Sequence, residues 1–531
     1  MQISFRGSIP CLLGVFTFAA LAASAPAAII DLDGTTYKTL SEAVAAAYAN
    51  EDGADIINIK VNALPTADTG WIVLDKPIII NGDAENGDGD GTPCDLIADN
   101  GAIAALAAQT DIGKAYIVVN APGDVFINDL RIHPLVDGVF NRSPNQQVLG
   151  IRCQRPISGT DTGHYTFKNV EVSGSDASGN FINLATGADL YNQTDVKHWA
   201  GDNRGDNYAL LNGVIQLDDT GAGVYDTVLD HCKAGLGYGS ALNMNAGAGT
   251  HQVLGGAYGH CGRDGIHVQG PGVTIRGTHD DRVRIIRSTN ISAANSHGFE
   301  MHGGSEVSLL EYVDIAGVNT ANCISVSGGH LAKMSFVRAM GKFTTDTNNH
   351  VVYVNGATTQ VDLVENCTFN GNSTGNFGYV PFQVMSTVPN SIEFKDSIFT
   401  CSAPDASSTP PPGTVTLQPV LTPPFSFTCC ALPNDGYAGE SLASTPLAGD
   451  GAATAIQTGI VSASPHYALT LSDYDWSDNQ GAGIAGNGPG NANVFRPTNP
   501  VYNNAASGGA RLNGGAGAAA AGIDASEWML M

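Results

Sequence analysis

The chain has 531 residues, and its 50 acidic against 24 basic side chains give a formal net charge of −26 at pH 7. A surface this acidic repels nucleic acid and anionic membranes at long range, so we expect no nucleic-acid partner. The 65 glycines and 25 prolines are typical of a chain with many tight corners.

Residues 1–27 have the pattern of a secretory signal peptide. Arg6 supplies a positive charge, residues 11–23 are apolar, and residues 25–27 (Ala-Pro-Ala) offer a small-residue cleavage site. We therefore predict a secreted or cell-surface protein, with an uncleaved anchor helix as the alternative. No later stretch reaches the roughly 18 apolar residues of a membrane span, so we expect no span in the mature chain.

Residues 28–110 are predicted to form an N-terminal cap and the first, irregular turns of the fold. Thr39 and Glu42 have the spacing of a helix capping box, and Val44 and Ala47 share one helical face. A single amphipathic helix at this place would cover the open end of a stack of strands, which otherwise exposes unpaired backbone groups.

A glycine- and aspartate-rich stretch in this region resembles the start of a calcium-binding loop. Residues 86–91 read Asn-Gly-Asp-Gly-Asp-Gly, so Asp88 and Asp90 are candidate ligands for Ca²⁺. The glutamate that closes such a loop is missing, because Ile97 stands at its position. Two alternatives stay open: a weak extracellular Ca²⁺ site, or a plain turn.

Between residues 111 and 401, short segments recur about every 29 residues, each with two apolar residues around one outward position. The pairs are Ile117/Val119, Ile151/Cys153, Ile182/Leu184, Ile215/Leu217, Leu242/Met244, Ile266/Val268, Phe299/Met301, Ile324/Val326, Val352/Val354 and Phe382/Val384. This alternation has the period of a β-strand. Each repeat buries its apolar face only by stacking on its neighbours, which predicts an all-β parallel β-helix solenoid with an N-terminal capping α-helix.

Further strand signals follow in each repeat, and an Asp or Asn stands between several of them: Asp129, Asn169, Asn366 and Asp396. These two residue types tolerate the left-handed backbone that a sharp corner requires. One turn of chain is therefore predicted to run strand, loop, strand, corner, strand, with successive coils about 4.8 Å apart.

Two segments after the repeats differ in composition. Residues 402–430 are Pro-rich and are interpreted as a loop or linker, and residues 431–531 as an irregular Gly/Ala-rich C-terminal segment. One of Cys429 and Cys430 is expected to bridge to Cys401.

Cys232 and Cys261 fall at matching places in successive repeats. Their predicted separation of one coil allows a disulfide, and each follows a histidine, which allows a Cys₂His₂ metal site. The third alternative is a pair of buried thiols that pack as small apolar side chains.

The outward positions stack into columns of polar side chains on one face of the predicted sheet. The first column runs Arg152, Asn183, Gln216, Asn243, His267, Glu300, Ser325, Tyr353 and Gln383. Side chains at a regular spacing can hydrogen-bond sugar hydroxyls. A second column lies two positions further along each segment and includes Asp218, Asn245, Gln269 and His302. These four residues, with Asn243 of the first column, are the candidate substrate-binding residues. The alternative is that any water-soluble β-helix places polar side chains outside.

His267 and Glu300 are the strongest catalytic candidates, because they lie on neighbouring predicted coils with their side chains roughly 5 Å apart. A carboxylate beside an imidazole raises the imidazole pKa and fixes the ring, which suits general acid–base chemistry. Asp264 is a third candidate, although strand geometry places it roughly 11 Å from Glu300. The competing interpretation is a purely structural His–Glu pair.

The sequence resembles the pectate lyase-like superfamily of right-handed parallel β-helices, in its secreted bacterial form. The resemblance rests on the signal, the repeats, the capping segment 37–43 (Tyr-Lys-Thr-Leu-Ser-Glu-Ala) and the tail segments 462–467 and 497–502. It implies a right-handed coil and an extracellular polysaccharide as partner. None of the superfamily's enzyme signatures is intact: residues 259–261 read Gly-His-Cys where one of them needs Gly-His-Gly.

Two functions from different classes therefore remain. The protein either cleaves an extracellular polysaccharide with His267 and Glu300 as an acid–base pair, or is a non-catalytic cell-surface or matrix protein, adhesive or structural.

Overall fold

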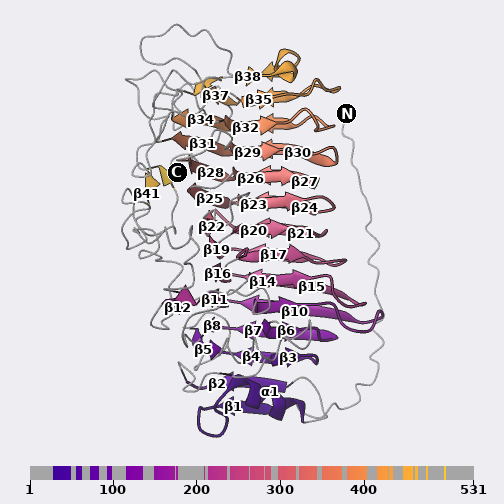
Figure 1. The fold of residues 1–531 in the computed structure, drawn as a ribbon, viewed down its shortest axis with the longest axis vertical. Helices are drawn as coiled ribbons and strands as arrows, with labels where there is room; N and C mark the ends of the chain where they lie inside the picture. The colour runs from indigo at the N-terminus through magenta and orange to yellow at the C-terminus, as the bar shows by residue number, and fades with distance from the viewer. Residues whose placement is uncertain are drawn as a thin grey trace, which may run out of the picture.

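The structure is a computed structural model, and it describes residues 28–49, 55–61, 68, 72–82, 93–98, 115–134, 149–173, 175–176, 208–209, 213–235, 239–261, 263–279, 281–288, 297–318, 322–343, 350–373, 380–402, 415–428, 430–433, 447–458, 461–463, 474–475 and 496–497. Figure 1 shows a tall stack of strands that rises from an N-terminal helix at the bottom to the last strands of the stack at the top. The signal segment 1–27 and the calcium candidates Asp88 and Asp90 lie outside the described residues.

Three long sheets, here named A, B and C, make up the stack, and every strand pair within them is parallel. Sheet A contains β1 (Ile29–Leu32), β2 (Asp55–Ile59), β4 (Ile78–Asn81), β7 (Gly123–Asn128), β10 (Thr162–Lys168), β15 (Val224–Asp230), β18 (His251–Leu254), β21 (Val273–Arg276), β24 (Glu306–Glu311), β27 (Gly329–Ser335), β30 (Thr359–Glu365), β33 (Glu393–Lys395), β36 (Ser426–Thr428) and β39 (Ile456–Thr458).

Sheet B contains β5 (Cys94–Ala98), β8 (Leu130–Pro134), β11 (Glu171–Ser173), β16 (Lys233–Gly235), β19 (Ala257–Cys261), β22 (Val283–Ser288), β25 (Val313–Val318), β28 (Arg338–Phe343), β31 (Thr368–Ser373), β34 (Ile398–Ser402), β37 (Ala431–Pro433) and β40 (Val461–Ala463). Sheet C contains β3 (Ile72–Leu74), β6 (Ala115–Val119), β9 (Leu149–Cys153), β14 (Gly213–Asp218), β17 (Leu242–Asn245), β20 (Ile266–Val268), β23 (His297–His302), β26 (Asn322–Ser327), β29 (His350–Val354), β32 (Val380–Val384), β35 (Val415–Leu417) and β38 (Leu447–Ala448).

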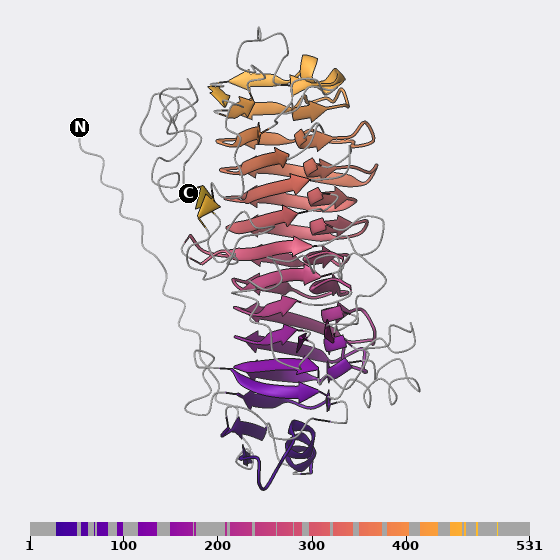
Figure 2. The ribbon, with the colours of Figure 1, turned by 60° about the vertical axis from the view of Figure 1, so that its left-hand side comes forward.

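Each turn of chain adds one strand to sheet C, then one to sheet A, then one to sheet B. Strands β20, β21 and β22 form one such coil, and β23, β24 and β25 form the next one, paired strand by strand with the first. Figure 2 shows the successive coils lying one above another. This repeated three-strand coil confirms the predicted parallel β-helix. Two small antiparallel pairs, β12 (Ser175–Asp176) with β13 (Tyr208–Ala209) and β41 (Tyr474–Asp475) with β42 (Arg496–Pro497), lie outside the three sheets.

The predicted inward pairs form the core, with one exception. Both members of nine of the pairs are at most 1% exposed, from Ile117/Val119 to Phe382/Val384. The exception is Ile182/Leu184, which lies outside the described residues. Because β9 pairs directly with β14, no coil separates these two strands in sheet C, and the predicted coil between them is wrong. In the outward column, Gln216 is directly in register with Arg152, so the predicted place of Asn183 between them is wrong.

The predicted corners are left-handed. Asp129, Asn169, Asn366 and Asp396 have φ values of 52°, 52°, 52° and 47°. The same corner in other coils is made by His231, Tyr312 and Phe336, with φ values of 54°, 49° and 52°, which the sequence did not indicate. A left-handed Tyr or Phe costs about 1–2 kcal/mol. The rings of Tyr312 and Phe336 stack at 4.6 Å, and this contact helps to offset that cost.

The helix α1 (Leu40–Tyr48) closes the N-terminal end as predicted. The Thr39 hydroxyl accepts a hydrogen bond from the Glu42 backbone N–H at 3.3 Å, and the Lys38 N–H donates to the Glu42 carboxylate at 2.7 Å. The buried side of the helix belongs to the same apolar core as the first strands: Leu40, Ala43, Val44 and Ala47. No helix in the described part of the chain is long and apolar enough to cross a membrane.

The stack continues past residue 401, so the interpretation of residues 402–430 as a linker is wrong for the strands that lie there. Strands β35, β36 and β37 extend sheets C, A and B, and β38, β39 and β40 add another coil within the segment predicted to be irregular. The reason is that Val415, Leu417 and Phe427 keep the inward alternation and are fully buried, while Pro419, Pro423 and Pro424 fall between strands.

The cysteines support the third of the sequence alternatives. Cys232 is a buried unpaired thiol whose Sγ donates to the Phe167 carbonyl at 3.3 Å, so it forms no disulfide with the buried Cys261. The side chains of Cys401 and Cys429 lie outside the described residues, and the predicted bridge there stays a prediction.

Candidate functional site

The candidate site lies on the outward side of sheet C, halfway along the stack. His267 is the central residue of β20, and the inward side chains on either side of it, Ile266 and Val268, are fully buried. Glu300 has the same place in β23, between Phe299 and Met301. The parallel register pairs His267 with Glu300 directly, which confirms that the two residues lie on adjacent coils.

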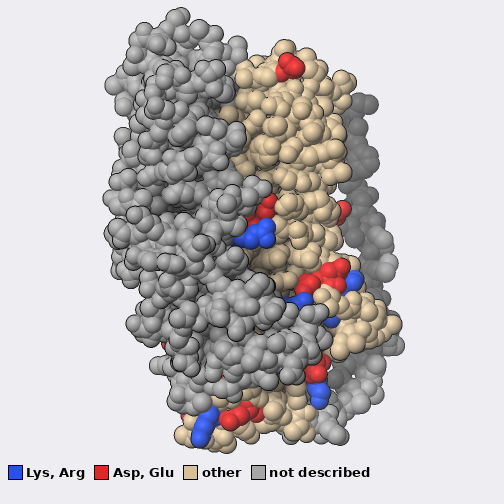
Figure 3. Space-filling model, viewed as in Figure 1, with Lys and Arg blue, Asp and Glu red and all other residues tan. Residues whose placement is uncertain are grey.

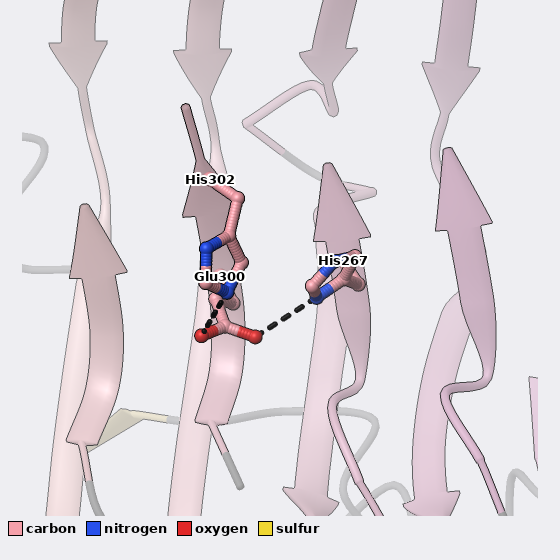
Figure 4. A group of neighbouring side chains, drawn as sticks. All are labelled: His267, Glu300 and His302. Carbon is pink, nitrogen blue, oxygen red and sulfur yellow. Dashed lines mark hydrogen bonds and ion pairs between the residues drawn. The ribbon is translucent and has the colours of Figure 1, made fainter. Parts of the chain in front are cut away.

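Glu300 lies between two histidines, as Figure 4 shows. Its Oε2 is 2.8 Å from Nδ1 of His267, and its Oε1 is 2.9 Å from Nε2 of His302. His302 follows two residues later on the same strand, so its side chain emerges on the same face. His267 and Glu300 are each only 4% exposed, whereas the His302 side chain is 42% exposed. Solvent therefore reaches the group at His302.

Asp264 joins this group, although strand geometry had placed it far away. Its Oδ2 is 3.2 Å from Nδ1 of His267, so the nearest oxygens of Asp264 and Glu300 are at most 6.0 Å apart, the sum of the two hydrogen-bond distances. The predicted separation of roughly 11 Å is wrong because the chain bends at Gly265, before β20 begins. We call Asp264, His267, Glu300 and His302 the His–Glu cluster.

A column of polar side chains that the sequence analysis did not identify supports the cluster. Its members lie three residues before the outward column: Ser240, Asp264, His297, Asn322 and His350. The Ser240 hydroxyl donates to Asp264 Oδ2 at 3.2 Å, and Asp264 Oδ1 accepts the His297 backbone N–H at 2.9 Å. Asn322 bridges the two histidines, 3.4 Å from His297 Nδ1 and 3.1 Å from His350 Nδ1. Aligning the repeats three positions earlier would have shown this column.

The cluster is electrostatically coupled. Burial alone would lower the pKa of His267, but hydrogen bonds with Asp264 and Glu300, and the charges on both carboxylates, raise it to about 9. Burial favours the neutral form of Asp264, yet the hydrogen bond and charge of His267 hold its pKa below the usual value. For His297, burial outweighs the two carboxylates and the pKa is lowered. At neutral pH, an imidazolium therefore lies between two carboxylates.

The predicted substrate-binding residues fall into two groups: those whose side chains are available to a ligand, and Asp218, which is held in an ion pair. Asn243 is in register with His267, and its Oδ1 is buried with no hydrogen-bond partner among the described residues. Gln269 is exposed and Asn245 is half-buried. Asp218 is only 8% exposed, and its carboxylate accepts a hydrogen bond from Nε of Arg152 at 2.8 Å. Asp218 is therefore committed to an ion pair, three coils from Glu300.

The outward column carries few charges besides the cluster. Gln216, Asn243, Ser325, Tyr353, Gln383 and Thr416 continue the column in register on both sides of His267 and Glu300. On the face of the molecule drawn in Figure 3, charged side chains are sparse over the upper, C-terminal part of the described surface and gather lower down. The column thus presents mainly amides, hydroxyls and one aromatic ring, the groups that hydrogen-bond and stack on neutral ligands.

Comparisons of the chain with models of protein families, with curated proteins and with solved structures gave no match. The assignment of a function therefore rests on the residues of this chain.

Proposed function

We propose that the protein is a secreted β-helix protein that acts on an extracellular polysaccharide along the outward face of sheet C, with His267 and Glu300 as its acid–base pair. The observation that carries the proposal is the direct 2.8 Å contact between these two side chains in the middle of a column of hydrogen-bonding groups. The resemblance to pectate lyase-like proteins adds the class of partner, by analogy only.

Each member of the His–Glu cluster has a distinct part in this proposal. Protonated His267 would donate a proton to the departing sugar oxygen. Glu300 would accept a proton, either from the water that attacks the sugar carbon in a hydrolase or from the ring carbon next to the uronate carboxyl in a lyase. Asp264 is fully buried, so it orients the His267 ring and does not meet substrate. The two catalytic carboxylates of a glycosidase lie about 5–9.5 Å apart, which raises the question whether Asp264 and Glu300 form such a pair. The burial of Asp264 argues against direct contact between this residue and the substrate. His302, Gln269 and Asn243 would hydrogen-bond the glycan.

A panel of neutral and acidic polysaccharides tests the proposal, with release of reducing ends and absorbance of unsaturated uronates as readouts. We expect cleavage by the wild type and loss of cleavage in both His267→Ala and Glu300→Gln. Asp362→Asn is the matched control, because Asp362 also pairs with a histidine, His330, at 2.8 Å but on sheet A. Retained cleavage in either cluster variant, with the fold intact by circular dichroism, contradicts the acid–base role.

The burial of the pair supports a second candidate function. Since His267 and Glu300 are each 4% exposed, a polymer could bind the column without reaching them. The protein would then be a non-catalytic glycan-binding or matrix protein. Saturable binding to a polysaccharide without turnover across the panel identifies this function.

Secretion is part of the same proposal and is supported by the N-terminal sequence pattern alone. N-terminal sequencing of the protein recovered from outside the producing cell should give a start close to residue 28. A mature chain that retains residues 1–27 argues for the anchor alternative.

A further inference from the structure

We propose that His267, Glu300 and His302 form a binding site for a divalent transition-metal ion. One nitrogen from each histidine and one Glu300 oxygen lie within 4.8 Å of one another. Figure 4 shows that the carboxylate of Glu300 lies between the two imidazole rings. Adjacent strands supply the three ligands, so the backbone that carries them is fixed by the parallel pairing of β20 with β23.

The distances between the donor atoms fit an ion after a small side-chain adjustment. Nδ1 of His267 and Nε2 of His302 are now 2.8 and 2.9 Å from the two Glu300 oxygens, as hydrogen-bonded atoms are. Ligand bonds of about 2.0–2.2 Å at a tetrahedral centre require roughly 3.4 Å between ligand atoms. Opening each contact by about 0.5 Å, through small χ rotations, makes room for the ion.

The donor atoms of the three side chains indicate which metal ions the site would bind. Two imidazoles and one carboxylate suit Zn²⁺, Fe²⁺, Ni²⁺ or Cu²⁺. Ca²⁺ takes six to eight oxygen ligands, and this site does not supply them. The site is therefore different in kind from the calcium loop that the sequence suggested at Asp88 and Asp90.

An independent observation is the lack of permanent cations around the buried carboxylates. Asp264 and Glu300 are 0% and 4% exposed, and among the described residues no Lys or Arg pairs with either. Two other buried carboxylates of this solenoid do have such partners: Glu171 pairs with Arg131 and Lys233, and Asp314 with Arg282 and Arg338. Asp55, which is also buried, has no such partner in the described part of the chain. A divalent ion would balance the charge of Asp264 and Glu300, whose ion-pair partners among the described residues are histidines alone, and burial strongly favours such a balance.

The site has an entry path and an open side. The His302 side chain is 42% exposed, and the chain turns at Gly303 and Gly304 directly after it. A Cβ atom added at either glycine would meet nothing within 4 Å, so the space beside His302 is open. An ion can enter there, and its remaining coordination position can hold water or a ligand.

The inference goes beyond the proposed function and does not rest on it, because the metal ion alone is the probe. It has one consequence for the proposed function. An ion on Nδ1 of His267 replaces the proton that acid–base chemistry needs, so Zn²⁺ should inhibit polysaccharide cleavage by that pair.

The experiment uses the mature protein without an affinity tag, stripped with EDTA and exchanged into metal-free buffer. We expect one saturable site for Zn²⁺ by isothermal titration calorimetry, and visible d–d absorption of bound Co²⁺ typical of mixed nitrogen and oxygen ligands. His302→Ala and Glu300→Gln should each weaken binding by at least about 10-fold, the smallest loss typical when even a supporting residue of a metal site is removed.

His330→Ala is the matched control, because His330 also pairs with a carboxylate at 2.8 Å but has no second histidine on that carboxylate. It should leave Zn²⁺ affinity unchanged. His302 is at the surface, so its variant tests the proposal even if Glu300→Gln does not fold. Absence of saturable binding overturns the proposal, and so does equal affinity in the wild type and His302→Ala.

Discussion

The stability of the protein should fall steeply in mild acid because His251 is buried as a neutral imidazole. His251, on β18, is 0% exposed; its Nδ1 lies 2.8 Å from the Thr227 hydroxyl, and its ring packs edge-on against Tyr225 at 5.2 Å. Burial lowers its pKa from 6.5 to about 4, and a hydrogen bond with the Gly247 backbone and the Asp226 charge offset this only in part.

The lowered pKa of His251 determines whether stability rises or falls with pH. The folded-state pKa lies below the unfolded value, so the unfolded chain binds a proton more tightly, and stability is lost as the pH falls through 6.5 toward 4. With these two values, the loss is well below about 1 kcal/mol at pH 7 and roughly 2–3 kcal/mol at pH 4.5. Protonation of His251 alone should therefore lower the stability by roughly 2–3 kcal/mol between the two pH values.

The assay is urea denaturation followed by circular dichroism at pH 7 and pH 4.5, on the wild type and on His251→Gln. Other groups also titrate in this range, so the informative quantity is the difference between the two proteins in their pH dependence. We expect the wild type to lose roughly 2–3 kcal/mol more than the variant. Equal losses would show that native His251 is already protonated or hydrated, and would refute the reasoning.

Three further predictions concern the core. Asp314→Asn should destabilise the protein by about 3–5 kcal/mol, because it leaves the buried guanidiniums of Arg282 and Arg338 without their carboxylate. Phe382→Ala should cost about 3–5 kcal/mol, since Phe382 is fully buried among other phenylalanine rings; urea denaturation at pH 7 measures both. Burial raises the pKa of Cys232 to about 12, so iodoacetamide should label this thiol only after denaturation, as residue-resolved mass spectrometry can show.

A specific result would contradict each of these three predictions. Asp362→Asn, at an exposed ion pair, is the control for Asp314→Asn and should change stability by less than about 1 kcal/mol. A similar effect of the two substitutions would contradict the buried charge cluster. Loss of less than about 1 kcal/mol in Phe382→Ala would mean that this ring is not in the core. Labelling of native Cys232 would place its thiol at the surface.

The coil could be predicted from the sequence because its two strongest signals are local. The alternation of apolar and polar residues around positions such as His267 predicts which side chains are buried. Asp129 and Asn169 indicate a corner because these residue types tolerate a left-handed backbone. The same alternation does not show, however, whether a given segment forms a coil of the stack. The pair Ile182/Leu184 has the same pattern as its neighbours, and only the pairing of β9 with β14 shows that no coil lies there.

The site could be predicted only where the chain is straight. His267 and Glu300 are one coil apart on regular strands, so register alone brings them together. Asp264 reaches them through the bend at Gly265, and strand geometry fails at a bend. Tyr312 at a corner was missed for a related reason: a stacked ring on the next coil compensates its backbone strain, and that contact is not local in sequence.

Amide hydrogen exchange with and without bound polysaccharide tests most directly whether the outward face of sheet C meets a glycan. With a polysaccharide that binds, we expect slower exchange in peptides that cover β17, β20 and β23, and unchanged exchange in sheet B. Protection confined to another sheet, or none with any polysaccharide of the panel, would contradict it.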